Sequence, residues 1–121
     1  MSRAALGLGL SLFALVTVPT AAAQDTAEVW LVGRSVRPSV VRYLEAQLEE
    51  LGVEVRTTRR VAAARGPVVV RVGRRSAVIA TREGDALVEQ RTVTLPRGLD
   101  TAGRARLAHA LRTVLRARQS D

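Results

Sequence analysis

The stretch that decides the fold covers residues 28–57 and reads EVWLVGRSVRPSVVRYLEAQLEELGVEVRT. It opens with EVWLVG (28–33), a continuous apolar run closed by glycine, as in a strand buried on both faces. Apolar residues then recur at helical spacing, with Ser35 as the expected N-cap and Gly52 as the expected C′ residue. VEVRT (53–57) alternates apolar and polar side chains and predicts a second strand. Because the connecting loops are short, the three elements are expected to form a βαβ unit with parallel strands.

The rest of the chain predicts a hairpin, a further strand and a closing helix. Residues 58–66 are interpreted as a polar connection with one helical turn. VVVRVGRRSAVIA (68–80) predicts a hairpin in which Gly73 leads a type II′ turn. Residues 87–95 follow as a fifth strand, and Asp100 is the expected N-cap of the last helix. The fold class is therefore α+β (an α/β two-layer sandwich) of order β-α-β-β-β-α, a mixed five-stranded sheet with two long helices on one face.

The amino terminus has the pattern of an export signal. Arg3 precedes an apolar run at residues 4–18, and a run of small residues ends at Ala23. This pattern predicts a signal peptide over residues 1–23, cleaved after Ala23. A membrane-spanning helix needs about 20 apolar residues, so an uncleaved anchor is the less favoured alternative. We expect a periplasmic or secreted protein with a single small domain over residues 24–121.

Composition excludes several kinds of chemistry. The chain has no cysteine, which excludes disulfides, cysteine-based zinc sites, thiol catalysis and lipid attachment at a cysteine. The only histidine, His109, is expected on the solvent side of the last helix, and Glu45, Glu49 and Glu50 are spread around the outer face of the first. No nucleophile, base or metal set can be assembled from these residues. The sequence predicts a protein that is not an enzyme and binds no cofactor or metal.

The basic residues are all arginines and are unevenly distributed. Residues 55–82 contain eight arginines and no acidic residue. If these charges converge in space, they could hold an anionic surface or polymer such as lipid or lipopolysaccharide. Nucleic acid is the less favoured partner, because this region has no aromatic side chain for stacking on bases. A solvated surface that protects hairpin edges is the alternative. The candidate anion contacts are Arg59, Arg60, Arg71, Arg74 and Arg75.

A second candidate surface is the sheet face away from the two helices. Trp30, Val32, Val69 and Val78 are predicted on that face, where apolar residues need a cover. The cover is the connection at residues 58–66, a second copy of the chain, or another protein. The leading hypothesis is an exported protein-binding or adaptor domain that uses this face or an unpaired sheet edge. The alternative hypothesis is an electrostatic binder that uses the arginines of residues 56–82.

Taken as a whole, the sequence pattern is similar to that of some exported proteins. An alanine-ended signal peptide, VWLVG (29–33), LGVEV (51–55), the VVVRVGRRSAVIA hairpin and LAHALRTVLRAR (107–118) resemble the small uncharacterised exported proteins of myxobacteria. The element order is also similar to that of the amino-terminal α/β domain of TolB, a periplasmic protein. The resemblance implies a periplasmic binding or adaptor module and assigns no residue to a site.

Overall fold

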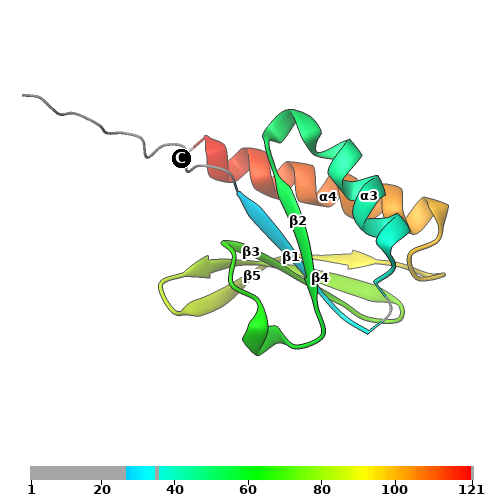
Figure 1. Cartoon of the computed structure of the whole chain (residues 1–121), viewed down its shortest axis with the longest axis horizontal. Coiled ribbons are helices and arrows are strands. Elements are labelled where there is room, and N and C mark those ends of the chain that lie inside the picture. The colour runs from blue at the N-terminus through cyan, green and yellow to red at the C-terminus, as the bar shows by residue number, and fades with distance from the viewer. Residues whose placement is uncertain (1–26, 35, 121) are drawn as a thin grey trace, which may run out of the picture.

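The structure is a computed structural model that describes residues 27–34 and 36–120 (Figure 1). The predicted signal peptide and Ser35 lie outside the described residues. The helices and strands are, in chain order, β1 (Glu28–Val32), α3 (Pro38–Gln47), β2 (Glu54–Thr58), β3 (Val68–Val72), β4 (Ser76–Glu83), β5 (Ala86–Thr94) and α4 (Thr101–Gln119). Short 3₁₀ turns, η2 (Glu49–Leu51) and η3 (Val61–Ala63), precede β2 and β3.

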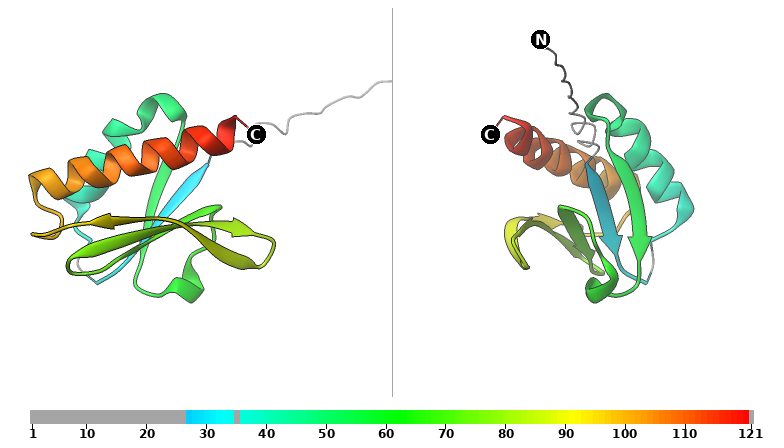
Figure 2. Two further views of the ribbon diagram at one scale, coloured as in Figure 1. Left: turned by 180° about the vertical axis from the view of Figure 1, so that it is seen from behind. Right: turned by 60° about the vertical axis from the view of Figure 1, so that its left-hand side comes forward.

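The five strands form one mixed sheet in the order β2-β1-β3-β4-β5. The interior strand β1 runs parallel to both β2 and β3, whereas β4 is antiparallel to its neighbours β3 and β5. Both long helices lie on one face of the sheet, as Figures 1 and 2 show. The predicted α+β fold, with its mixed five-stranded sheet and two helices, is therefore confirmed.

The first helix begins later than the sequence predicts. Arg37 occupies the N-cap position without a side-chain cap, and Pro38 is in the first turn, so the expected N-cap at Ser35 is wrong. The reason is local: a residue before proline is disfavoured in the α conformation, so the helix starts at the proline itself. The regular helix ends at Gln47, and Gly52 ends the following η2 turn with a φ of 65°. The left-handed glycine predicted after the helix is thus present, one 3₁₀ turn further on.

In the 68–80 hairpin, the side chains lie on the predicted faces of the sheet, but the turn is not of the predicted type. Val70 is opposite Ile79, and Val72 is opposite Ala77, which places the apolar side chains of both strands toward the helices. Within the described chain, positive φ occurs only at Gly52, Gly84 and Gly98, so a type II′ turn led by Gly73 is wrong. The conformation that requires glycine occurs in the next turn instead, where Gly84 precedes Asp85 between β4 and β5.

The main core lies between the sheet and the two helices. The Asp100 side chain accepts a 2.8 Å hydrogen bond from the backbone N–H of Gly103, which confirms the predicted N-cap of α4. Fully buried leucines of both helices pack against valines of β1 and β3 and against Ile79 of β4. The centre of this layer is filled, and candidate functional surfaces are therefore sought on the second sheet face and toward the ends of the strands.

Candidate functional site

The second sheet face is covered by the protein's own chain. Residues 59–67, here called the covering connection, pass beneath the sheet and contain η3 (Figure 2). Ala64 of this segment packs in a small core with Val32 and Val69, whose exposed fractions are 6% and 0%. The Arg82 guanidinium fixes the segment, donating to the backbone oxygens of Gly66 at 3.2 Å and Ala64 at 3.0 Å.

This cover changes the interpretation of the four residues predicted as a partner face. Val32 and Val69 are buried under the covering connection, whereas Trp30 and Val78 are half-buried. The indole N–H of Trp30 donates to Glu28 at 2.9 Å. The predicted face is thus not open as a unit, because only its margins reach solvent, and the intramolecular cover is the one of the three expected alternatives that the structure contains.

Three of the eight arginines of residues 55–82 are engaged within the fold. Arg56 lies 3.6 Å from Glu28 and 3.2 Å from Glu54, and Arg71 lies 2.7 Å from Glu89. Arg82 holds the covering connection, as described above. The absence of counter-charges in the local sequence was misleading, since sheet pairing brings Glu28 of β1 and Glu89 of β5 beside these side chains, and Glu54 immediately precedes the segment. Arg71 is therefore an ion-pair residue on the sheet face rather than an unpaired anion contact.

The remaining candidates gather at one edge of the sheet. The carboxyl ends of the parallel strands β1, β2 and β3 meet there, and the end of β5 joins them because β5 runs in the same direction as β3. Backbone hydrogen bonds tie the following loops together: Gly33 N–H donates to Thr58 at 3.0 Å, and Leu95 N–H donates to Arg75 at 2.8 Å. We call the arginines of these loops the basic rim; they are Arg34, Arg37, Arg59, Arg60, Arg74, Arg75 and Arg97.

The basic rim carries almost no compensating charge. Within residues 27–34 and 36–120, no ion pair joins any rim arginine to a carboxylate. Asp100 is the only acidic residue in the loops at this edge, and its carboxylate caps α4. Acidic side chains concentrate at the other end of the strands, because α3 runs back from the rim and brings Glu49 and Glu50 there, near Glu54. The fold thus places positive charge at the basic rim and negative charge at the opposite end of the strands.

A hollow of about 520 Å³ lies within the basic rim. Arg34 and Arg74 line it together with Val72 and Leu99, and the glycine backbones at 73 and 98 complete the lining. The start of α3 is close by; it has no side-chain cap and no acidic residue in its first turn. Guanidinium groups bind carboxylate and phosphate oxygens in bidentate fashion, and the positive end of a helix dipole favours the same charge. The chemistry of this edge suits oxyanions.

Part of the basic rim is predictable from the sequence, and part of it is not. Arg59, Arg60, Arg74 and Arg75 were predicted and are brought to one edge. Arg34, Arg37 and Arg97 were not predicted, because the charge count was confined to one segment of the chain. The available signal was topological: loops after neighbouring parallel strands meet at one sheet edge, where ligands of open α/β sheets bind.

The described residues give little support for a catalytic histidine, a metal site or a membrane-spanning helix. His109 is exposed on α4, as predicted. Over residues 27–34 and 36–120, no three histidine, aspartate or glutamate side chains come together as metal ligands would. None of the described helices combines the length and the apolar character that crossing a membrane requires.

Comparison with known proteins gives no functional assignment. No protein-family model matches the chain, and no match was found among curated proteins or solved structures. The resemblance to TolB and to small exported proteins therefore stays a prediction.

Proposed function

We propose that this protein is an exported, non-enzymatic binding module that holds an anionic surface or polymer, lipid or lipopolysaccharide for example, at its basic rim. The observation that carries the proposal is the convergence of seven arginines from four loops on one edge, without ion pairs to described residues. Charges that converge in this way add their fields, whereas the same charges spread over a surface would not.

The character of the rim favours an extended ligand over a small one. Six of the seven rim arginines lie in loops, the seventh, Arg37, occupies the N-cap position of α3, and all are exposed. Exposed guanidinium groups next to a flat or flexible polyanion each contribute about 1 kcal/mol, so several must act together. A partner with repeated phosphate or carboxylate groups satisfies that requirement better than a single small anion.

Binding of a protein partner along an outer strand of the sheet is the second candidate. β5 (Ala86–Thr94) is an outer strand of the sheet, and Val88 on it is 42% exposed. An unpaired outer strand can accept an added strand from a partner through backbone hydrogen bonds. However, β5 contains a register shift opposite Ile79 and Ala80, and such bulges hinder strand addition. We therefore rank this candidate below binding at the basic rim.

Vesicle binding at two salt concentrations tests the proposal. The protein should co-sediment with vesicles that contain phosphatidylglycerol and stay in solution with pure phosphatidylcholine. Raising the salt from 0.1 M to 1 M shortens the screening length from about 10 Å to about 3 Å and should weaken binding at least about tenfold. Absence of binding to the anionic vesicles, equal binding to neutral vesicles, or binding that does not respond to salt would contradict the proposal.

A further inference from the structure

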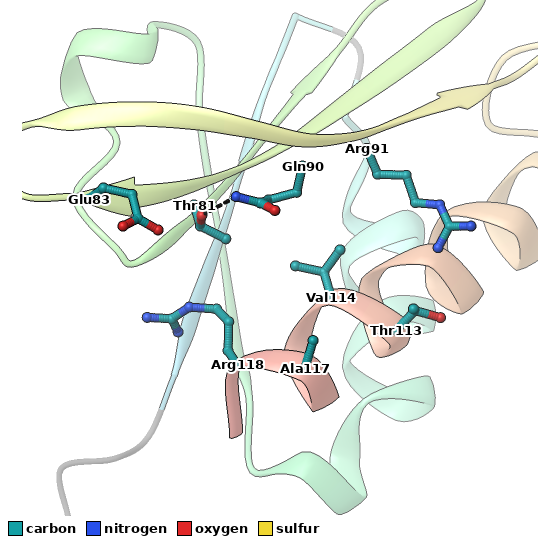
Figure 3. A pocket seen from close by; sticks show the side chains of 8 residues that line it. All are labelled: Thr81, Glu83, Gln90, Arg91, Thr113, Val114, Ala117 and Arg118. Atoms are coloured by element: carbon teal, nitrogen blue, oxygen red, sulfur yellow. Dashed lines mark hydrogen bonds between the residues drawn. The ribbon is translucent and has the colours of Figure 1, made fainter. Parts of the chain in front are cut away.

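A second hollow lies at the opposite end of the strands from the basic rim. It has a volume of about 450 Å³ and is bounded by β4, β5 and the carboxyl-terminal half of α4 (Figure 3). Thr81 and Gln90 line its sheet side, and Val114 and Ala117 line its helix side. The volume is within the range of about 300–1,000 Å³ typical of small-molecule sites.

A β-bulge places two consecutive side chains of β5 in this hollow. Glu89 is opposite Ala80 and Arg91 is opposite Ile79, so Gln90 is an extra residue on β5. Ile79 belongs to the core beneath the helices, and therefore Arg91 also faces the helices. Bulges often redirect side chains next to binding sites.

Gln90 faces the hollow as well. Its amide Nε2 donates to the Thr81 hydroxyl at 2.9 Å, and Thr81 is the one buried polar residue of the described core, at 3% exposure. This bond fixes the amide and leaves its oxygen as a hydrogen-bond acceptor. Figure 3 shows the oxygen on the side toward α4. The sheet side of the hollow thus presents a fixed polar group.

Charged side chains lie at both ends of the hollow. Arg91 lies at one end, near Thr113, whereas Glu83 lies at the other end together with the Arg118 guanidinium (Figure 3). Among the described residues, none of these three charged side chains forms an ion pair within 4.0 Å. A guanidinium and a carboxylate that face one space without meeting complement a ligand that carries both charges.

We propose that this hollow binds a short zwitterionic peptide, with its carboxylate at Arg91 and its ammonium group at Glu83. Length selects the class of ligand. Ile79, the partner of Arg91, is four residues from Glu83 along β4, a distance of about 13 Å at the rise of a strand. The Glu83 side chain points into the hollow, whereas the Arg91 side chain points toward Thr113 and away from Glu83 (Figure 3). An extended tripeptide is about 10 Å long, and a polar contact of about 3 Å at each end lets it reach both groups, whereas the charges of a free amino acid lie too close together.

The peptide backbone would find partners between the two ends. The Gln90 amide oxygen can accept from a peptide N–H, and the Thr113 hydroxyl, which itself donates to His109 at 3.1 Å, can accept another. Val114 and Ala117 offer an apolar wall for small side chains. The site does not involve the basic rim, so it is a second binding activity that holds or fails independently of the proposed function.

Amide NMR titration of the purified protein tests this inference. The probes are trialanine, N-acetyl-trialanine and trialanine amide, each titrated to millimolar concentration. Trialanine should shift the amides of Thr81, Gln90, Arg91 and Val114. Acetylation of its amino group, or amidation of its carboxyl group, should each weaken binding at least about tenfold, because each removes one charge-assisted contact.

Variants assign the two ends of the ligand. Glu83→Gln should weaken trialanine binding at least about tenfold and leave N-acetyl-trialanine unaffected, since that probe has no ammonium group. Arg91→Gln should weaken trialanine binding by a similar factor and leave trialanine amide unaffected, since that probe has no carboxylate. Arg116→Gln, on the side of α4 that faces Glu50, is the matched control and should bind trialanine like the parent. Each spectrum also reports whether its variant is folded. The inference is overturned if trialanine leaves these amides unshifted, or if the blocked peptides bind as tightly as trialanine.

Discussion

Replacing Arg74 and Arg75 together with glutamate should weaken binding to anionic vesicles by about 100-fold. Both side chains are exposed at the turn between β3 and β4, in the middle of the basic rim. Each basic residue close to an anionic surface contributes about 1 kcal/mol, and a reversal also adds a repulsion. The double variant therefore loses about 3 kcal/mol of binding free energy after partial screening by salt. This loss corresponds to an affinity that is about 100-fold weaker.

The turn itself should tolerate this double substitution. The contact that Arg75 makes with the end of β5 uses its backbone oxygen, which accepts from Leu95 N–H at 2.8 Å. A control with the same change in net charge is Arg42→Glu with Arg65→Glu, at exposed positions outside the basic rim. Vesicle affinity of this control should fall by much less. If both pairs weaken binding equally, net charge alone governs it, and the basic rim is not the contact surface.

Gly66→Ala should destabilise the protein by about 2 kcal/mol, within the usual range for overpacking. A Cβ atom at Gly66 would lie 2.6 Å from Trp30 Cδ1 and 2.9 Å from the backbone oxygen of Glu28. That backbone belongs to β1, which is paired with a strand on each side, so it cannot move away without disturbing the sheet. The covering connection must shift instead, which loosens Ala64 and the Arg82 hydrogen bonds that hold it.

Thermal unfolding measures this effect. For a domain of about 100 residues, a loss of 1 kcal/mol lowers the Tm by about 4–8 °C, so the expected fall is about 10 °C. Arg65→Ala is the matched control, because it changes the adjacent, exposed side chain of the same segment and should alter the Tm little. An unchanged Tm for Gly66→Ala would mean that the covering connection does not pack against β1 as described.

The architecture was predictable because its signals are local. The helical spacing of Val40, Leu44 and Leu48 and the alternation along the 68–80 hairpin each identify an element from a few neighbouring residues. The Asp100 cap needs no tertiary information either. Turn geometry was less predictable: glycine occurs at both Gly73 and Gly84, and only the backbone of the folded hairpins decides which one takes positive φ.

The candidate site was less predictable because it depends on contacts between distant segments. Arg71 belongs to a cluster in the sequence, but the pairing of β4 with β5 places Glu89 beside it. Conversely, Arg34 and Arg97 are far apart in the chain and come to the same edge through strand direction alone. The burial of Val69 likewise depends on the path of the covering connection. The spacing of apolar residues in the sequence does not predict that path.

The most direct test of the basic rim is an amide NMR titration with inositol hexakisphosphate, a soluble polyanion that replaces the extended surface. Binding at the rim predicts shifts that concentrate in the four loops that carry the rim arginines, at residues 33–37, 59–60, 73–75 and 96–98. The acidic end of the strands, with Glu49 and Glu50, should stay unshifted. Shifts of similar size at exposed arginines outside these loops, such as Arg42 and Arg65, would contradict the account, because binding would then follow overall charge and not the edge that the fold assembles.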